Sequence, residues 1–326
     1  MTAIGSCQSA PDQKQLQGYF ENTSQEDLQK TRWDTGDTTI TNEDRLDLFR
    51  PHVLNRGGGY IGVGSSQNLS LAAWAGSEWV WLVDFTRIVV AVNKANLAFI
   101  QESPTPTEFR YFWQKENDTA ALAVIRKHYA QAKDLAFILE SFRKSRPYQL
   151  RRFRNDDIVT QKYNFALWLY DQKLYDHIRR LAIGGRIIAR QGDIRGPITI
   201  KSVAHQAALM QVPIRTIYFS NAEEYFDLDG SFRENWLAIQ GDKTALVVRT
   251  ISVDRWDYPW APGSELSTTR GFHYNIQSLG SYQSWLRSGP PGLRTRMILK
   301  TGTIDKANGF SQVSSLYRTT DAQVIP

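Results

Sequence analysis

The sequence predicts an α/β protein with a doubly wound, mostly parallel β-sheet. Apolar segments of strand length alternate along the chain with segments whose apolar residues recur at helical spacing. Residues 56–84, RGGGYIGVGSSQNLSLAAWAGSEWVWLVD, form one complete unit of strand, glycine turn, helix and second strand, and the unit ends in a carboxylate. Polar residues also gather where the other predicted strands end, and ligands bind at those ends in open α/β sheets.

The composition is that of a globular protein. At 326 residues, 41% of them hydrophobic, the chain is long enough for one large α/β domain or two smaller ones. The formal net charge is +6, but 39 basic side chains are interspersed with 33 acidic ones, which favours nucleic acid only weakly as a partner. The densest basic run, within residues 143–154, is interpreted as the solvated end of a helix. No apolar run of about 20 residues occurs, so no membrane-spanning segment is predicted.

Residues 1–35 are predicted to form a flexible polar N-terminal segment. Within it, IGSC at residues 4–7 is similar to the end of a bacterial lipoprotein signal, whose cysteine becomes lipid-modified. Only three residues precede this motif, whereas a signal peptide needs an apolar segment of roughly 7–15 residues there. Two interpretations stay open: a lipid anchor at Cys7 in a bacterial envelope, or an ordinary polar tail on a cytoplasmic protein.

The α/β domain is predicted over residues 36–253. Its strands are predicted at residues 60–64, 79–83, 186–190, 213–219 and 244–251. Its helices are predicted at residues 46–54, 65–76, 88–100, 117–139, 162–181 and 198–210. Residues 105–183 are interpreted as a helical insertion between the second and third strands, because strand patterns do not resume before residue 186. Residues 254–326, which are interrupted by proline and glycine, are predicted to pack on the domain as a C-terminal extension.

The first strand and the first turn favour a nucleotide-like ligand. In nucleotide-binding α/β folds, glycines let the backbone approach the ligand, and an acid about 20 residues on accepts hydrogen bonds from a ribose. The alternative is structural: glycines that a tight turn requires, an acid on the surface, and polar side chains that cap helices. The candidate cofactor-binding residues are Gly62, Gly64, Gln67, Asn68, Asp84 and Asp193.

A second polar cluster follows the fourth strand. Asn221, Glu224 and Tyr225 are candidate catalytic residues, because an acid beside a tyrosine can do general acid/base work. They could equally form a solvated first helical turn, where acidic side chains are favoured. Further candidate pocket residues near strand ends are Asn42, Glu43, Arg87, Ser220 and Arg249.

Several other chemistries find no support in the sequence. The five histidines form no spaced ligand pair, and Cys7 is the only cysteine, so no metal site and no internal disulfide are predicted. The sequence contains neither a phosphate-binding loop of the Gly-x-x-x-x-Gly-Lys-Ser/Thr type nor a Gly-x-Ser-x-Gly nucleophile elbow.

Together, these segments resemble a family of largely uncharacterised bacterial proteins with a class I methyltransferase-like fold, some of them lipoprotein-like. The resemblance covers roughly residues 38–252. The family patterns read Ser-Asn-Glu, Tyr-x-Gly-Val-Gly-x-x-Gln-Asn, Val-Asp-x-Arg-Arg and Ser-Asn-Val-Glu-Gln-Tyr. The matching residues here are Asn42, Glu43, Gly62, Gly64, Gln67, Asn68, Asp84, Asn221, Glu223 and Tyr225. Phe85-Thr86 departs from the pattern after the acid, which leaves only Arg87 for an anion contact.

The resemblance implies S-adenosylmethionine as the cofactor. Gly62 and Gly64 would line its site, Asp84 would hold the ribose hydroxyls and Asp193 would lie near adenine, while Asn221, Glu224 and Tyr225 would orient a methyl acceptor. This chain departs from methyltransferase patterns at three places: Tyr60 stands where an acid is usual, Ser66 replaces the third glycine, and Ser220-Asn221 does not begin Asn-Pro-Pro-Tyr.

The sequence leaves the function open between classes. One hypothesis is an S-adenosylmethionine-dependent methyltransferase-like protein that acts on a small-molecule or other unidentified substrate. The alternative is an envelope-associated lipoprotein that keeps the fold without methyl transfer and has a binding role or another enzymatic role. A nucleic-acid methyltransferase would rest only on the basic run within residues 143–154.

Overall fold

The computed structural model describes residues 10–253, 260, 265 and 271–318. Cys7 and the predicted breaks at Pro259, Pro262 and Gly263 lie outside these residues.

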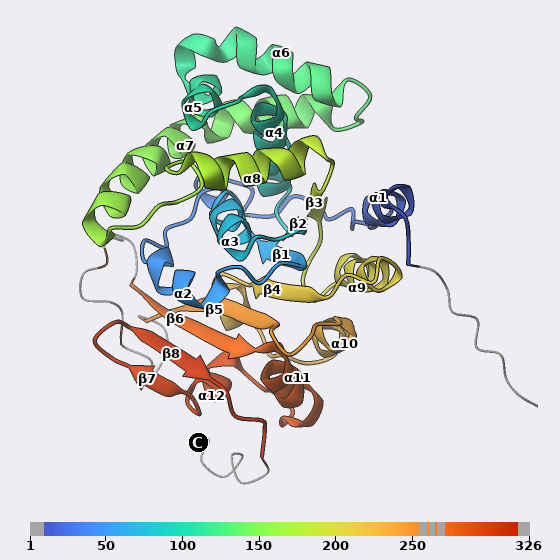
Figure 1. Ribbon diagram of the computed structural model, residues 1–326, viewed down its shortest axis with the longest axis vertical. Helices are drawn as coiled ribbons and strands as arrows, with labels where there is room; N and C mark the ends of the chain where they lie inside the picture. The colour runs from blue at the N-terminus through green and yellow to red at the C-terminus, as the bar shows by residue number, and fades with distance from the viewer. Residues whose placement is uncertain (1–9, 254–259, 261–264, 266–270, 319–326) are drawn as a thin grey trace, which may run out of the picture.

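A single eight-stranded sheet forms the centre of the molecule (Figure 1), with the strand order β3-β2-β1-β4-β5-β6-β8-β7. The strands are β1 Gly59–Val63, β2 Trp79–Asp84, β3 Ile187–Gln191, β4 Ile214–Tyr218, β5 Leu246–Ser252, β6 Phe272–Ser278, β7 Thr303–Asp305 and β8 Phe310–Val313. All neighbouring pairs are parallel except β5 with β6 and β7 with β8. The predicted α/β class with a mostly parallel sheet is therefore confirmed.

Strands β1 to β5 are mutually parallel, so they all end at the same edge of the sheet. We call this the carboxyl edge; it is formed by the ends of the five strands at Val63, Asp84, Gln191, Tyr218 and Ser252. The chain moves outward from β1 to β3 on one side and returns to β4 on the other side of β1. Such a reversal between two neighbouring strands opens the crevice in which doubly wound sheets bind ligands.

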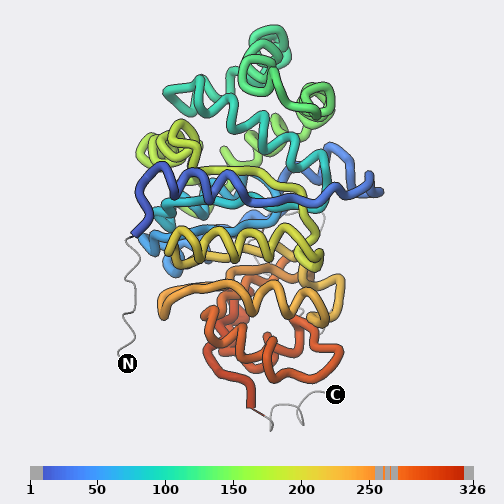
Figure 2. Tube along the Cα trace, turned by 90° about the vertical axis from the view of Figure 1, so that its right-hand side faces the viewer, coloured from blue at the N-terminus to red at the C-terminus, as the bar shows by residue number. Residues whose placement is uncertain are grey.

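Helices cover both faces of the sheet. They are α1 Gln13–Glu21, α2 Arg50–Val53, α3 Gln67–Ala75, α4 Arg87–Glu102, α5 Pro106–Trp113, α6 Asp118–Tyr129, α7 Leu135–Tyr163, α8 Gln172–Ile183, α9 Thr199–Leu209, α10 Ser231–Ala238, α11 Leu279–Ser288 and α12 Thr295–Leu299. One face packs against α2 to α8, and the other packs against α1 and α9 to α12. Figure 2 shows α1, α9 and α10 side by side on this second face. Because both faces are covered, β1, β2 and β5 are buried along their whole length, which explains their continuous apolar sequences.

Five α-helices, α4 to α8, lie between β2 and β3, and two of their predicted boundaries are wrong. The predicted helix 117–139 is two helices, because the chain turns at residues 130–134 between α6 and α7. The predicted helix 162–181 begins only at residue 172, after Asp171 accepts hydrogen bonds from the N–H groups of Lys173 and Leu174. The large apolar residues at 165–169, which continue the helical spacing, are instead buried in non-helical chain; they are Phe165, Leu167, Trp168 and Leu169.

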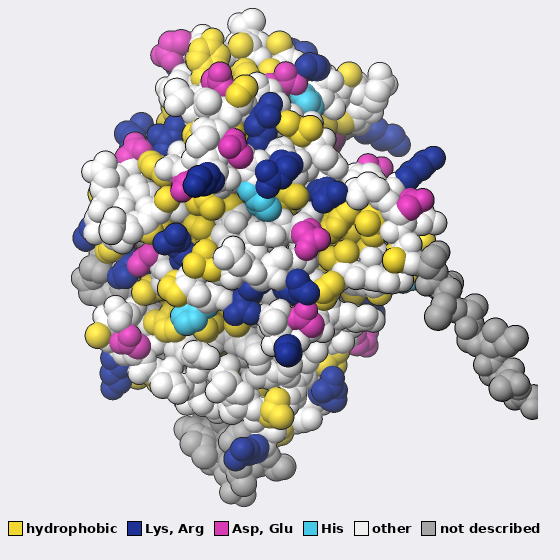
Figure 3. Space-filling view, viewed as in Figure 1, with side chains coloured by type: hydrophobic (Ala, Val, Ile, Leu, Met, Phe, Trp, Pro, Cys, Tyr) yellow, Lys and Arg dark blue, Asp and Glu magenta, His cyan; other side chains and the backbone are white. Residues whose placement is uncertain are grey.

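The basic run within residues 143–154 lies inside α7, so its interpretation as a helix end is wrong. Its side chains have several partners: Arg143 and Arg146 both pair with Asp118, and Arg152 is buried. On the face of the molecule in Figure 3, lysine and arginine side chains are scattered among acidic and apolar ones. Each helix in the described part of the chain is too short or too polar to cross a bilayer.

The N-terminal residues differ from the flexible segment predicted up to residue 35. Helix α1 begins at a capping box in which Asp12 and Gln15 bond each other's backbone N–H. At its other end Phe20 is fully buried, with ring centroids 4.9 Å from Trp79 and 4.8 Å from Trp81. Helix α1, which was predicted to be part of a flexible polar segment, therefore docks on the sheet through its apolar face.

The C-terminal residues continue the sheet. Strand β6 pairs antiparallel with β5, and β8 and β7 extend the sheet beyond it. Helices α11 and α12 then pack on the same face as α9 and α10.

Replacing Phe20 by alanine tests the docking of α1. We expect the free energy of unfolding to fall by about 3–5 kcal/mol, because the substitution leaves a cavity against two tryptophan rings. Urea unfolding followed by tryptophan fluorescence would measure the change. Lys14→Ala, on the exposed side of the same helix, is the control. Equal unfolding midpoints for the two variants would contradict the packing of α1.

Candidate functional site

Residues 22–45 run along the carboxyl edge, and we call them the N-terminal strap. The strap contacts the strand ends in the order in which the strands lie in the sheet: first β3, then β2, and finally β4 and β5. An acidic side chain anchors it at each of these three places: Glu26, Asp34 and Glu43.

Glu26 fills the loop that follows β3. Its carboxylate accepts hydrogen bonds from the backbone N–H groups of Asp193, at 2.7 Å, and Ile198, at 3.0 Å. It lies so close to Gly196 that a Cβ there would overlap its oxygens. Asp193 itself is turned toward Arg195, whose guanidinium lies 2.7 Å away. Burial raises the pKa of Asp193, but the hydrogen bonds from Arg195 outweigh it, and the pKa is lowered.

Asp34 and Asp84 meet at the end of β2. Asp34 accepts a hydrogen bond from the N–H of Ile88 in the first turn of α4, at 3.1 Å. Asp84 accepts two from Thr86, at 2.8 Å from the N–H and 2.7 Å from the hydroxyl, and a third from the N–H of Gly64. Burial, with a smaller contribution from the Asp34 charge, raises the pKa of Asp84 to about 6. The structure thus brings Gly64 and Asp84 together. The Asp84 carboxylate, however, accepts its hydrogen bonds from Thr86 and Gly64 of the protein itself.

Glu43 ties the end of the strap to β4 and β5. It accepts hydrogen bonds from Tyr218, from Ser220 at 2.7 Å and from Thr250 at 2.6 Å. Ser220 adopts a left-handed backbone conformation at φ +52°. Burial raises the pKa of Glu43, although the three hydroxyl donors act in the opposite direction. Its neighbour Asn42 is exposed.

Gly62, in the glycine turn, has a structural explanation. A Cβ at Gly62 would overlap the side-chain amide of Asn68. That amide accepts from the Tyr60 hydroxyl at 2.7 Å and donates to the carbonyls of Val63 and Ser65 at 3.0 and 2.9 Å. Asn68 therefore fixes the turn and points into it.

The residues predicted to be catalytic do come together. The Asn221 amide donates to Glu224 at 3.0 Å and to the Tyr225 hydroxyl at 3.1 Å. Glu224 also accepts from the backbone of Ser252 at 2.7 Å, which fixes it to the end of β5. A small pocket of about 10 Å³, with room for about one water molecule, borders this cluster and is lined by Glu223, Glu224, Ile251, Arg294, Thr295 and Arg296.

Two of the predicted pocket residues take structural roles. Arg249 is fully buried in mid-strand, where its guanidinium donates to Glu223 at 3.0 Å, to Asn275 at 2.9 Å and to Gln277. Arg87 begins α4 and stacks on the Phe137 ring, 4.5 Å from its centroid. Neither arginine lines a described pocket.

A second pocket at the carboxyl edge, which we call the edge pocket, has a volume of about 10 Å³, which is room for about one water molecule. It is lined by Thr41, Leu46, Ser66, Gln67, Ser70, Arg152, Asp156, Leu167, Trp168 and Leu169. Of these only Gln67 was a candidate from sequence.

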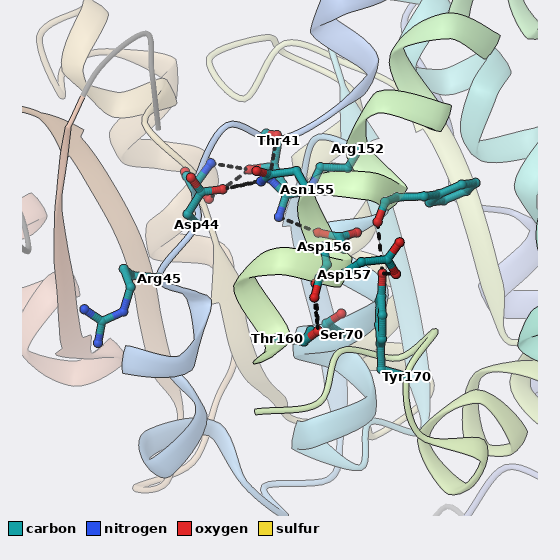
Figure 4. Close-up of polar contacts among 12 residues, drawn as sticks. Thr41, Asp44, Arg45, Ser70, Arg152, Asn155, Asp156, Asp157, Thr160 and Tyr170 are labelled. Carbon is teal, nitrogen blue, oxygen red and sulfur yellow. Dashed lines mark hydrogen bonds and ion pairs between the residues drawn. The ribbon is translucent and has the colours of Figure 1, made fainter. Parts of the chain in front are cut away.

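Arg152 lies in the wall of the edge pocket, and Figure 4 shows its polar contacts. It is 4% exposed, and its guanidinium lies 3.0 Å from the Thr41 carbonyl, 3.3 Å from Asp44 and 2.6 Å from Asp156. The i,i+4 spacing of Arg152 and Asp156 on a helix is the sequence signal that could have paired them. No spacing pattern in the sequence could have paired Arg152 with Asp44, which lies more than 100 residues away along the chain.

Residues 38–314 match a domain of unknown function, DUF7790. The chain belongs to this family. The match begins within the strap and runs through β8. No curated protein matches the chain. Among the residues that the structure describes, no three histidine, cysteine, aspartate or glutamate side chains are grouped so that they could hold a metal ion.

Asp84→Asn tests the environment of this acid through pH. Because the pKa is raised in the folded state, from 3.8 to about 6, the stability that Asp84 contributes is present below pH 3.8 and is lost as the pH rises through 6. As the pH rises from 4 to 6, the wild type should therefore lose stability relative to Asp84→Asn. The difference between their free energies of unfolding should shift in favour of the variant by up to about 3 kcal/mol.

Urea unfolding at pH 4, 5, 6 and 7 would measure this difference. Asp305→Asn is the matched control, because hydrogen bonds from Asn308 lower the pKa of this exposed acid and no such gain is expected. Parallel stability curves for the wild type and Asp84→Asn would show that Asp84 ionises as an ordinary surface acid.

Proposed function

We propose that the chain is an S-adenosylmethionine-dependent methyltransferase-like protein whose methyl acceptor is still to be identified. One observation carries the proposal: the strand order reverses between β1 and β4, and at that place a glycine turn meets the acid at the end of β2. Nucleotide-binding sheets hold a ribose and its neighbouring groups at such a reversal. The proposal includes the class I methyltransferase type of fold, with α5 to α8 as its helical insertion.

The proposed cofactor would use residues on three neighbouring strand ends. Gly62, Gly64 and Gln67 would line it, Asp84 would accept hydrogen bonds from the ribose hydroxyls, and Asp193 would lie beside adenine. Asn68 would contribute indirectly, because its side-chain amide holds the turn in shape through hydrogen bonds to the carbonyls of Val63 and Ser65. The bound cofactor would supply an electrophilic methyl group.

The strap limits access to this site. Glu26 occupies the N–H of Asp193, and Asp34 lies close enough to Asp84 for its charge to raise the pKa of that acid. Cofactor binding therefore requires the first part of the strap to move. The apparent affinity is then reduced by the fraction of molecules in which the edge is open.

The acceptor would be oriented by the cluster that follows β4. Tyr225 is 48% exposed, so its hydroxyl can meet a substrate, while Glu224 is buried and fixed by Ser252. Asn221 joins the two side chains. An acid held beside an exposed phenol is an arrangement that can receive a proton from an acceptor.

The strap also favours a second candidate function. Because Glu26 and Asp34 already satisfy backbone donors at the edge, the chain could keep the fold without methyl transfer. This candidate is an envelope-associated protein with lipid on Cys7, whereas the methyltransferase would be cytoplasmic. Mass spectrometry of the native N-terminus separates the two locations, since a diacylated or triacylated Cys7 fits only the envelope.

Titration calorimetry with S-adenosylmethionine and S-adenosylhomocysteine tests the cofactor. Glu26→Gln weakens the first anchor of the strap, because hydrogen bonds to a charged group contribute about 1.5–3 kcal/mol. This variant should therefore bind both compounds at least about tenfold more tightly than the wild type does. Asp84→Ala should lose binding. Glu234→Gln, in an exposed acid of α10, should bind like the wild type.

The result that rejects the cofactor is an absence of binding in both the wild type and Glu26→Gln at concentrations far above cellular levels. If Glu26→Gln binds the cofactor and the wild type does not, the proposed site is supported and the strap is what blocks it.

A further inference from the structure

Helix α7 has a cationic face that is exposed to solvent. The helix runs along the outside of the molecule (Figure 1), and its apolar side packs into the core. Of the side chains that α7 leaves exposed, Glu140 is the only acid. The exposed cations of α7 are Arg143, Lys144, Arg151, Arg154 and Lys162, and we call them the α7 cationic face. Residues 143–162 extend over about 30 Å of helix, at roughly 1.5 Å per residue.

The acids close to this face already pair with other cations. They are Asp118 with Arg146, Asp157 with Arg110, and Asp44 and Asp156 with Arg152. In the part of the chain that the structure describes, no carboxylate pairs with Lys144, Arg151 or Arg154. The Arg151 guanidinium instead stacks on Tyr148, 5.2 Å from its ring centroid. These three cations are therefore available to an external anion.

The N-terminal strap adjoins the α7 cationic face. The Lys144 ammonium donates to the carbonyl of Asp34 at 3.2 Å. Gly36 lies so close to α7 that a Cβ there would overlap the Tyr148 ring. The exposed charges of the strap itself balance, with Lys30 and Arg32 against Asp27 and Asp37. The strap therefore adds no net charge, but its contacts place the α7 cationic face beside the carboxyl edge.

Two exposed aromatic rings lie at the carboxyl edge next to this contact. Trp33 precedes Asp34 in the strap and is 43% exposed, with the Arg32 guanidinium 4.8 Å from its ring centroid. Phe85 directly follows β2 and is 37% exposed. Both rings belong to the end of β2, because Asp34 accepts from the N–H of Ile88 in the first turn of α4. Bases of single-stranded nucleic acids stack on exposed rings that lie beside cations.

This surface suits a nucleic acid strand better than an anionic membrane. A helix that lies in a membrane interface buries a wide apolar face in the lipid. The apolar face of α7 is buried in the protein instead, and Ile158 is the large apolar side chain that the helix leaves exposed. Lipid headgroups also have no bases to stack on Trp33 and Phe85. In a duplex the bases stack on one another, so the two rings favour a single strand.

We propose that the chain binds a single-stranded nucleic acid, whose phosphates contact the α7 cationic face and whose bases stack on Trp33 and Phe85. Both rings are exposed with the strap in place, so this binding needs neither a movement of the strap nor a cofactor. A base stacked at the end of β2 would lie at the edge where the proposed cofactor binds. Only a transfer of methyl to that base rests on the proposed function.

Fluorescence anisotropy on the full chain tests the proposal, with labelled oligo(dT) and oligo(U) as probes between about 50 and 200 mM salt. The logarithm of the association constant should fall against that of salt with a slope of about −2, because three phosphate contacts contribute about −0.7 each. Arg151→Gln/Arg154→Gln should weaken binding about tenfold or more and reduce the slope to about −0.7. Lys243→Gln/Arg287→Gln is the matched control, because it removes the same charge from the turn before β5 and from α11 on the opposite face of the sheet.

Trp33→Ala tests base stacking separately from charge. It should weaken both oligonucleotides about fivefold or more while leaving the salt slope unchanged, because stacking releases no counterions. Tyr111→Ala removes another exposed ring, on α5, and should bind like the wild type.

Three results would each overturn the proposal: no binding by the wild type at about 50 mM salt, equal weakening by the two double variants, or full affinity of Trp33→Ala for both oligonucleotides. Binding to phosphatidylglycerol vesicles without binding to either oligonucleotide would also overturn it and assign the α7 cationic face to a membrane. None of these measurements contains S-adenosylmethionine, so a failed cofactor titration leaves this test unaffected.

Discussion

The carboxyl edge of the sheet imposes the main constraint on this molecule. Five parallel strands end there, and the turns that follow them present backbone N–H groups and hydroxyls that need partners. The strap supplies carboxylates for them at Glu26, Asp34 and Glu43. The position of the strap therefore decides which parts of the edge stay open.

Local sequence patterns were sufficient for much of the fold. The apolar runs of β1 and β2 and the glycine at φ +98° between them have their causes within a few residues, so the α/β class and the first five strands could be predicted. Helix boundaries were missed where long-range packing decides. The apolar chain at 165–169 has helical spacing, but it is buried without forming a helix.

The candidate site was predictable only in part for the same reason. Asn221, Glu224 and Tyr225 lie within five residues, and their cluster exists. Glu26 and Arg152, by contrast, act through partners more than 100 residues away, which no spacing along the chain reveals. Arg249 was misassigned because mid-strand and strand-end arginines look alike in sequence.

The strap is part of the same chain as the edge that it covers. It therefore acts as a tethered competitor, present at a fixed effective concentration that dilution of the protein cannot lower. Any ligand of the β2 and β3 ends must outcompete it through its own concentration and complementarity. Glu26 and Asp34 also precede the residues matched by the family, so this internal competitor is supplied largely by chain that lies outside the family domain.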